Sequence, residues 1–355
     1  MSTSHEYDRA DAPADALRLH LNEHTGGCSP RVLEAIRRVS AADVARYQDY
    51  GPLHADVAAR FGIAADQLLL TNGLDEGLLA AAIAWLRDDH REAIVLEPAF
   101  GMYADVVEAV GGTLVRVAPR PDFALDVEAV RAAVTPRTGL LFATSPGNPT
   151  GLSLSADEIR ALAGLLPPHA LLLLDEAYAE FAETSWLDDV RARAGASGVV
   201  FPPSIVVGRT FAKAYGLAGL RAGALMGDAA TIRRLRRVVP PYSLNVFVVA
   251  ALTAAMDDTA YTADYIRQTR ESKALLYAAC DRLGLGYVPS DANFVLVRAG
   301  DRRQALLDGL EARGIYVRDR HGQPGCEGCI RITTGLVEHT AQCIAAMEEI
   351  LCAGA

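Results

Sequence analysis

From about residue 68 onward, short apolar segments alternate with longer segments of helical pattern, and this alternation constrains the fold more than any other feature. Nearly every position within the short segments is apolar, which is typical of strands buried on both faces of a mostly parallel sheet. The sequence therefore predicts an α/β layered domain. The predicted strands are Ala93–Leu96, Leu114–Val117, Gly139–Ala143, Leu171–Leu174, Ile205–Val207 and Gly223–Met226.

Two helix starts carry specific capping signals. Ser29 suits an N-cap and Pro30 the first helical position, which predicts a helix over the following residues RVLEAIRRVS. Ser155 and Glu158 have the spacing of a capping box in front of the apolar segment IRALAGLL. We interpret the first 30 residues as an irregular arm.

The pattern changes after about residue 250, where long helical segments precede a strand, a helix, two short strands and a final helix. The first strand is ANFVLVR, and the two short strands are IYVRD and CIRITTG. This order suits a smaller α+β domain. We expect residues 1–45 to form an N-terminal arm that packs with the small domain, residues 46–250 to form the large domain, and residues 251–355 to form the small domain.

Composition and charge exclude several functions. The net charge of −10 argues against partners such as nucleic acid or an anionic membrane. No apolar run approaches the ~20 residues of a membrane span, and the polar, acidic N-terminus lacks the features of a signal peptide. Cys326 and Cys329 form a single CxxC without a second ligand pair, so we expect reduced thiols and no metal. A soluble, cytoplasmic protein is expected.

Only two of the 34 basic residues are lysines, Lys213 and Lys273, and this limits any chemistry that uses a primary amine. Arginine stays protonated, so a Schiff-base enzyme made from this chain has two candidate nucleophiles. Lys213 lies in the apolar, glycine-rich segment GRTFAKAYGLAGLRAG, where burial lowers a lysine pKa and leaves the neutral amine that attacks an aldehyde. Lys273 lies in the polar helical segment RQTRESKALL, and we expect it to be a solvated surface lysine.

Two further features suit a phosphate group. Thr210 and Arg221 flank Lys213 in the sequence, and a hydroxyl and a guanidinium are common phosphate ligands. Residues 71–77, TNGLDEG, combine a strand end, a glycine turn and a helix start, which leaves backbone N–H groups free to bind phosphate.

Asp175 and Asn148 suit an aromatic ring. Asp175 ends a strongly apolar strand, where ligand sites of open α/β sheets lie. A carboxylate there can hold a ring nitrogen protonated, which makes the ring an electron sink; the alternative is an aspartate that caps the next turn. Asn148 lies in the rigid turn SPGNPTG, where its amide can reach a ring substituent, and the alternative is a turn without a ligand.

Seven motifs occur in the order and spacing of fold-type I pyridoxal-phosphate (PLP) aminotransferases of class I/II: TNGLDEGL, PAFGMY, SPGNPTG, LLLLDEAYAEF, RTFAKAYGLAGLRAG, SDANFVLVR and CIRITTG. From about Leu19 to the C-terminus the chain resembles this family, and it is most similar to the histidinol-phosphate aminotransferase branch. The resemblance implies a fold-type I PLP-transferase, with a mostly parallel seven-stranded sheet in the large domain and a smaller α+β domain. It implies a transaminase that moves an amino group between an amino acid or amine, histidinol-phosphate-like or aromatic or polar, and a 2-oxo acid such as 2-oxoglutarate.

The resemblance also implies a role for each matching residue. Lys213 would hold the cofactor pyridoxal 5'-phosphate as a Schiff base and move a proton during catalysis. Asp175 would pair with the pyridine nitrogen, and Phe100, where the family usually has tyrosine, would stack on the ring. The ring oxygen would be bound by Asn148 and Tyr178, and the phosphate would be surrounded by Gly73, Leu74, Asp75, Thr210 and Arg221.

Other matches concern the partner subunit and the substrate. Tyr47, in RYQDYG, matches a tyrosine that reaches the phosphate from the partner, which implies a homodimer with shared active sites. Arg331 matches the arginine that grips the substrate carboxylate or, in this branch, helps with the substrate phosphate, and Arg318 matches a second arginine near it. Asn293 lies beside them, and Asn22, in LNEHTGGCSP, completes the substrate-binding group.

Three positions depart from the family pattern. Ala212 stands where the family often has serine, which removes one phosphate hydroxyl. His24 replaces an asparagine, and Gly26 replaces an aromatic residue that helps hold the substrate phosphate in histidinol-phosphate enzymes. The amino donor therefore stays open. The alternatives are other PLP chemistry on the same scaffold, as in an amino-acid phosphate decarboxylase, lyase or cyclase, and a PLP-sensing regulatory domain, for which the chain lacks a basic DNA-binding segment.

Overall fold

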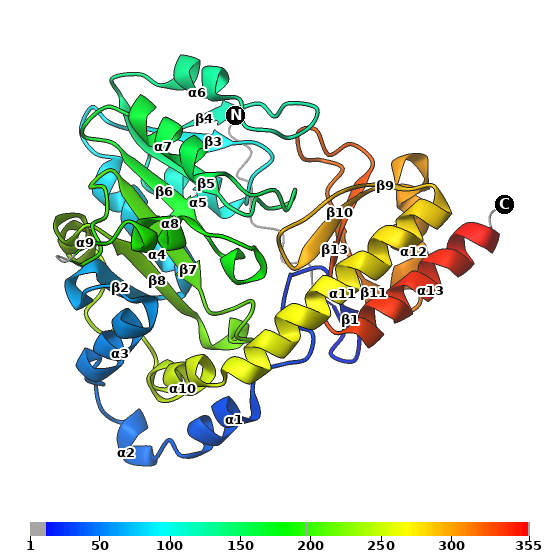
Figure 1. Cartoon of the computed structure of the whole chain (residues 1–355), viewed down its shortest axis with the longest axis horizontal. Helices are drawn as coiled ribbons and strands as arrows, with labels where there is room; N and C mark the ends of the chain where they lie inside the picture. Colours follow the sequence, from blue (N-terminus) through cyan, green and yellow to red (C-terminus); the bar gives the residue numbers. More distant parts are fainter. Residues whose placement is uncertain (1–11, 196–197, 354–355) are drawn as a thin grey trace.

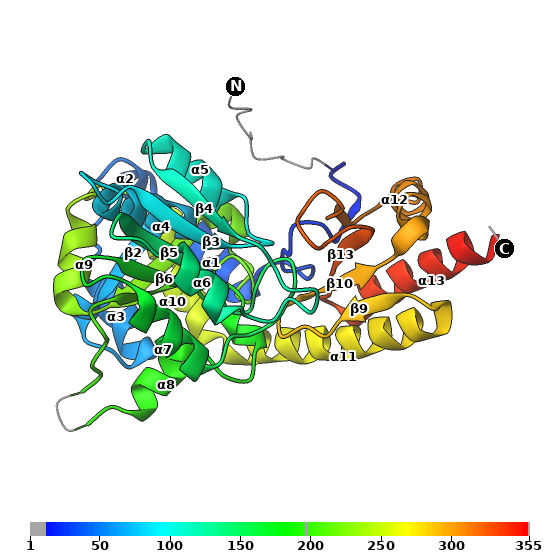
Figure 2. The same cartoon turned by 90° about the horizontal axis from the view of Figure 1, so that it is seen from above.

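The computed structural model describes residues 12–195 and 198–353, and within them the chain forms a larger and a smaller layered unit (Figures 1 and 2). Residues 1–11 of the predicted arm lie outside the described residues. The long helix α11 (Thr259–Leu283) runs along the smaller unit, and its N-terminal end reaches the larger unit. The predicted domain limits near residues 45 and 250 stay a prediction.

The larger unit is built on a seven-stranded sheet with the order β2-β8-β7-β6-β5-β3-β4. All of its neighbouring strands are parallel except at β8, which is antiparallel to β2 and β7. The mostly parallel sheet and the six predicted strands are confirmed, with strand ends that differ by up to three residues. The strands are β2 (Leu68–Asn72), β3 (Glu92–Leu96), β4 (Thr113–Val117), β5 (Thr138–Thr144), β6 (Leu171–Asp175), β7 (Ile205–Thr210) and β8 (Ala222–Gly227).

Strand β6 shows why these segments are continuously apolar. Leu171 and Leu173 pack into one hydrophobic core, and Leu172 and Leu174 pack into another. Because successive side chains of a strand point to opposite faces, both faces of the sheet are buried. The helices that supply the covering layers are α1 (Pro30–Arg37), α3 (Gly51–Phe61), α4 (Gly73–Trp85), α5 (Met102–Ala109), α6 (Val127–Ala133), α7 (Ala156–Leu165), α8 (Trp186–Ala192), α9 (Ala229–Arg236) and α10 (Val246–Asp257). The short helix α2 (Ala41–Val44) buries no residue.

The predicted helix caps are confirmed. The Ser29 side chain accepts a hydrogen bond from the Arg31 N–H, and Ser155 and Glu158 form the reciprocal bonds of a capping box. The first helix is shorter than predicted and ends at Arg37. Ser40, expected to be its last residue, instead accepts from the Asp43 N–H and begins the separate helix α2.

The smaller unit contains an antiparallel sheet with the order β12-β13-β10-β9. The predicted single strand over residues 315–319 is wrong, because its two ends pair with different partners. Its first residues form β11, which pairs in parallel with β1 from the N-terminal arm, and its last residues form β12, which pairs with β13. The elements are β1 (Leu17–Arg18), β9 (Gly286–Val288), β10 (Phe294–Arg298), β11 (Ile315–Tyr316), β12 (Arg318–Asp319), β13 (Cys329–Thr333), α12 (Arg303–Glu311) and α13 (Val337–Ala353).

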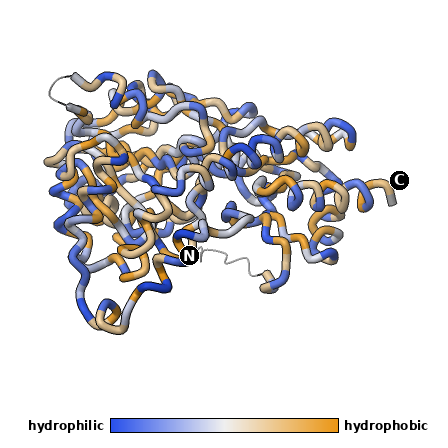
Figure 3. Tube along the Cα trace, turned by 60° about the horizontal axis from the view of Figure 1, so that its bottom comes forward, coloured by the Kyte–Doolittle hydropathy of each residue, from blue (hydrophilic) through white to orange (hydrophobic). Residues whose placement is uncertain are grey.

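Apolar and polar segments are interspersed along the trace of both units (Figure 3). Within the described residues, no helix is both long enough and apolar enough to cross a membrane.

Candidate active site

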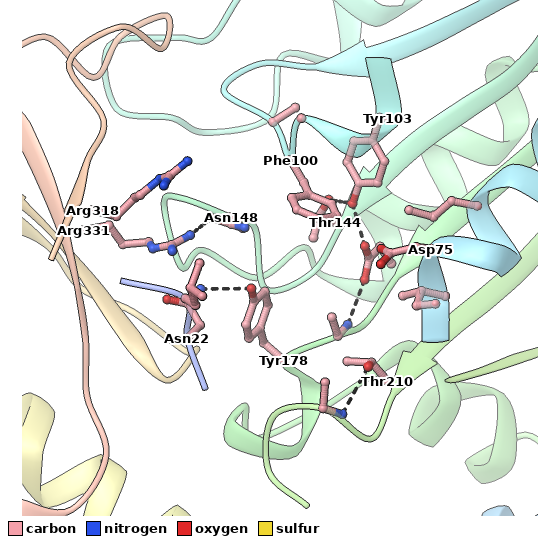
Figure 4. Close-up of a pocket in the computed structure, with 18 of the residues that line it drawn as sticks. Asn22, Asp75, Phe100, Tyr103, Thr144, Asn148, Tyr178, Thr210, Arg318 and Arg331 are labelled. Atoms are coloured by element: carbon pink, nitrogen blue, oxygen red, sulfur yellow. Dashed lines mark hydrogen bonds between the residues drawn. The ribbon is translucent and has the colours of Figure 1, made fainter. Parts of the chain in front are cut away.

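A cavity of about 800 Å³ lies between the two units. Its large-unit wall includes the carboxyl ends of β5, β6 and β7, the edge where open α/β sheets bind ligands, and β12 and β13 face it. Most residues singled out from the sequence line it, and Figure 4 shows how several of them lie. They are Asn22, Leu74, Asp75, Phe100, Asn148, Asp175, Tyr178, Thr210, Lys213, Arg221, Arg318 and Arg331.

Lys213 lies in the turn that follows β7. Its Nζ donates a hydrogen bond of 3.0 Å to the Leu21 carbonyl oxygen, so the N-terminal segment covers the amine. Removal from water lowers the pKa of Lys213 to about 8, and the positive charge of Arg331 adds to the effect. A substantial fraction of this amine is therefore neutral at mildly alkaline pH, as a nucleophile requires.

Asp175 is the last residue of β6 and is buried. Its Oδ1 accepts from the Ala177 N–H at 2.9 Å, and its Oδ2 accepts from the Tyr103 hydroxyl at 2.7 Å. Burial raises the pKa of Asp175 to about 6, and these two hydrogen bonds oppose the rise. Asp175 therefore caps the turn that follows β6, one of the two alternatives drawn from the sequence, and it also lines the cavity.

The start of α4 forms one corner of the cavity. No side chain caps the first N–H groups of this helix, which leaves them available to an anion. Gly73 has φ +75°, and a Cβ there would lie 2.6 Å from Arg221 Nη2, so the corner requires glycine. Arg221 Nη2 donates to Asp75 Oδ2 at 2.6 Å, and Thr210 Oγ1 accepts from the Ala212 N–H at 3.2 Å.

Existing hydrogen bonds determine whether Asn148 and Tyr178 donate or accept toward the cavity. Arg331 Nη1 donates to Asn148 Oδ1 at 2.5 Å, so the amide N–H groups of Asn148 remain as donors. Asn22 Nδ2 donates to the Tyr178 oxygen at 3.0 Å, so the hydroxyl hydrogen of Tyr178 is left for another acceptor. The two side chains together present donors to the cavity (Figure 4).

Arg318 and Arg331 lie directly opposite each other in the register of β12 and β13. Like charges in directly opposed positions destabilise a sheet. Arg331 is 3 % exposed and also donates to the His20 carbonyl oxygen at 2.5 Å. This arrangement favours an anionic ligand, because an anion offsets the cost of placing two guanidinium groups together.

Asn293 is buried and lies behind the cavity rather than in its wall. Its Nδ2 donates to the Asn22 carbonyl oxygen at 3.2 Å. Asn22 has φ +55° and exchanges two hydrogen bonds of 3.1 Å with the Thr333 hydroxyl. The N-terminal segment is thus attached to β13 beside the cavity.

Tyr47 is not among the described residues that line the cavity. It is 82 % exposed, and its ring stacks on Tyr242 with ring centroids 4.4 Å apart.

The expectation that Lys273 is solvated is wrong. It is 9 % exposed, its Nζ donates to the Ser290 carbonyl oxygen at 2.6 Å, and burial lowers its pKa to about 8. Leu276 and Cys280 follow it three and seven positions later and are fully buried. Lys273 therefore lies on the core-facing stripe of α11, a periodicity that outweighs its polar neighbours in sequence.

Two ion pairs at the cavity wall were not expected from the sequence. Arg18 binds Glu23 through two hydrogen bonds of 3.1 Å, and Arg116 pairs with Glu97. Their partners are 5 and 19 residues apart along the chain, and no local motif marks either pair.

Comparison with known proteins agrees with this geometry. The family "Aminotransferase class I and II" matches residues 14–346. Histidinol-phosphate aminotransferase from Symbiobacterium thermophilum is 37% identical over 339 residues, covering 95% of this chain and 91% of the relative. The crystal structure of histidinol-phosphate aminotransferase from Sinorhizobium meliloti in complex with pyridoxal-5'-phosphate superposes with a TM-score of 0.84 at 29% identity, over 96% of this chain and 92% of that one. The crystal structure of a protein from Erwinia carotovora atroseptica described as "Putative histidinol-phosphate aminotransferase" gives a TM-score of 0.85 at 26% identity, over 96% of this chain and 97% of that one.

The chain belongs to the class I and II aminotransferase family. It is a PLP-dependent aminotransferase with the fold-type I architecture. The residues present fit the cofactor, because the cavity combines a lysine of lowered pKa, a buried carboxylate and an uncapped helix start.

Proposed function

We propose that this aminotransferase transfers the amino group of histidinol phosphate, or of an aromatic or polar amino acid, to a 2-oxo acid such as 2-oxoglutarate. The observation that carries the proposal is the opposed pair Arg318 and Arg331 at the cavity wall. Two guanidinium groups in one partly desolvated pocket favour substrates with anionic groups. The names of the relatives point to the same donor and to amino-acid biosynthesis.

The large unit supplies the groups that would hold the cofactor. When bound, PLP supplies a ring that stabilises negative charge at the substrate Cα. In our proposal Lys213 holds the cofactor and moves the proton at that carbon, Asp175 holds the ring nitrogen, and Phe100 covers the ring face. Asn148 and Tyr178 donate to the ring oxygen, which agrees with the donors that they present.

The corner at the start of α4 would bind the cofactor phosphate. The N–H groups of this turn and the Thr210 hydroxyl supply hydrogen bonds, and Arg221 supplies positive charge. Ala212 contributes no hydroxyl, so the uncapped helix start carries more of the binding here. The proposed phosphate group comprises Gly73, Leu74, Asp75, Thr210 and Arg221.

Two departures from the family pattern bear on the donor. Neither His24 nor Gly26 is among the described residues that line the cavity. A Cβ at Gly26 would lie 3.2 Å from His24 Cε1, and the His24 ring stacks on Tyr265 with centroids 3.4 Å apart. In our proposal the arginines therefore replace the missing aromatic residue as the main contacts of the substrate phosphate, supported by Asn22 and Asn293.

Steady-state kinetics test the proposal. With 2-oxoglutarate as acceptor, kcat/KM for histidinol phosphate should exceed that for unphosphorylated histidinol by about a hundredfold. Arg331→Ala should lower kcat/KM for 2-oxoglutarate about tenfold to a hundredfold, because hydrogen bonds to a charged group are lost. Arg131→Ala on α6 is the matched control, since its ion pair with Glu128 is exposed on both sides and contributes little, so the change should stay within about fivefold. An unchanged kcat/KM in Arg331→Ala would contradict this assignment of the anion site.

The proposed active unit is a homodimer with shared active sites. Large exposed apolar side chains gather on α1, on α2 and the segment after it, and on α10 and the segment before it, which adjoin one another in Figure 1. They are Leu33, Val44, Tyr47, Tyr242 and Phe247. A second copy on this face would remove them from water and bring Tyr47 to the partner's cofactor phosphate. The six free thiols support the cytoplasmic location that belongs to the same proposal.

Sedimentation velocity tests the dimer. Wild type should sediment as a dimer, and Val44→Asp should shift the population toward monomer with loss of activity. Tyr47→Phe should leave the dimer intact and weaken PLP binding about tenfold, the effect of one hydrogen bond to a charged group. A fully active monomer would rule out shared sites.

A further inference from the structure

A buried chain of hydroxyl groups lies behind the Asp175 carboxylate. Tyr103, on α5, places its hydroxyl oxygen 2.7 Å from Asp175 Oδ2 and 2.7 Å from Thr144 Oγ1 (Figure 4). Tyr103 is 1 % exposed, and Thr144 and Asp175 are neighbours in the register of β5 and β6. Three elements therefore meet at one phenolic oxygen.

The direction of the hydrogen bonds follows from the carboxylate. An ionised carboxylate only accepts, so the single hydroxyl hydrogen of Tyr103 goes to Asp175, and Thr144 donates to the phenolic oxygen. Burial and the nearby charge of Asp175 raise the pKa of Tyr103 well above 10, which keeps it a donor at any working pH. Its ring is held by stacking on Phe142, with centroids 4.8 Å apart, and by an edge contact with Phe100 at 5.8 Å.

The hydroxyl of Tyr103 affects both the charge and the orientation of Asp175. Burial favours the protonated carboxyl, and the bonds from Tyr103 and from the Ala177 N–H favour the ionised one. The two donors bind different oxygens, which fixes the rotation of the carboxylate about its last bond. Each oxygen retains acceptor capacity for a further donor in the cavity.

We propose that Tyr103, backed by Thr144, is a positioning residue that keeps Asp175 ionised and oriented to bind the cofactor ring nitrogen. The inference rests on the proposed role of Asp175 at that nitrogen. It assigns a function to the last residue of the motif PAFGMY.

A binding cycle tests the inference without measuring turnover. The apoenzyme is titrated with PLP and with its 1-deaza analogue, in which a C–H group replaces the ring nitrogen. Wild type should bind PLP at least tenfold more tightly than the analogue. Tyr103→Phe should reduce this ratio about tenfold, because a less ionised Asp175 gains less from the ring nitrogen. Thr144→Val should reduce the ratio in the same direction by a smaller factor.

A purely structural effect of the lost hydroxyl would weaken both ligands equally and leave the ratio unchanged. Tyr265→Phe is the matched control, because Tyr265 is also buried and its hydroxyl hydrogen-bonds to the backbone of residues 23 and 25, not to Asp175. Its ratio should equal that of wild type. If Tyr103→Phe keeps the wild-type ratio of PLP to analogue affinity, the proposed role of Tyr103 is overturned, whereas the role of Asp175 is not. No preference for PLP in wild type would overturn the role of Asp175 and this inference with it.

Discussion

The two halves of the cavity differ in how their charges are arranged. In the more buried half, at the ends of β6 and β7, Asp175 and Thr210 are buried, and Asp175 is bound by donors of its own chain. In the more exposed half, Arg18 of β1 and Arg116 of β4 are about half exposed and pair with carboxylates. The buried half can shift pKa values and hold one fixed geometry, whereas water screens the open half. Substitutions in the buried half should therefore have the larger effects.

The two lysines give the largest expected contrast. Burial lowers the pKa of each to about 8, yet only Lys213 faces the cavity. Lys213→Ala should abolish the visible absorption of the bound cofactor and lower transaminase activity by about 10⁴-fold. Lys273→Met should keep the absorption and lower the melting temperature. Borohydride reduction followed by peptide mapping should label Lys213 alone; a label at Lys273 would show that a lowered pKa suffices for reactivity.

Asp175→Asn gives the next effect. The substitution keeps the shape of the side chain and removes its charge, so kcat should fall about 10²- to 10³-fold, and PLP should bind about tenfold more weakly because the bond to the ring nitrogen loses its charge. Asp75→Asn is the control from the exposed corner of the cavity, where 42% of the carboxylate side chain is in contact with water, and its kcat should fall less than tenfold. Stopped-flow single-turnover measurements separate the proton-transfer step from binding. Equal losses in the two variants would remove the proposed difference between the halves.

The pH dependence of cofactor capture gives the smallest effect. Lys213 is neutral above its pKa of about 8, and only the neutral amine attacks an aldehyde. The rate at which the apoenzyme captures PLP should therefore rise about tenfold per pH unit below pH 8 and level off above it. The appearance of visible absorption after mixing measures this rate. A midpoint near the pKa of an exposed lysine would contradict the desolvated environment of Lys213.

Sequence patterns predicted the large sheet and the strand-end residues that gather at the cavity wall, because both depend on local signals. Apolar strand segments fix the sheet, and the residues at strand ends then meet at one edge, as Asp175 and Thr210 do. The opposite wall depends on contacts between distant segments. The tie between Asn22 and Thr333 joins residues 311 positions apart, which no periodicity connects.

Lys273 shows a different limit of sequence analysis. Its immediate neighbours are polar, which favoured the prediction that Lys273 lies on the surface. The buried positions of α11 recur with helical spacing, however, and Lys273 is one of them. The helical spacing of the buried positions can be recognised in the sequence. The Ser290 carbonyl that accepts from the Lys273 ammonium lies in the loop between β9 and β10, and the sequence did not indicate that contact. Whether a charged residue on a helix can be buried thus depends on whether a distant segment supplies a hydrogen-bond acceptor.

The pairing of β1 with β11 has a consequence for synthesis on the ribosome. Leu17 leaves the exit tunnel early, but its partner Ile315 follows ~300 residues later, about 15–60 s at usual elongation rates. The large sheet can form during this interval, while Leu19, which is fully buried in the core of the smaller unit, has no native neighbours there. The smaller unit therefore completes last, from both ends of the polypeptide, and an isolated fragment that starts at residue 251 would lack one edge of its own core.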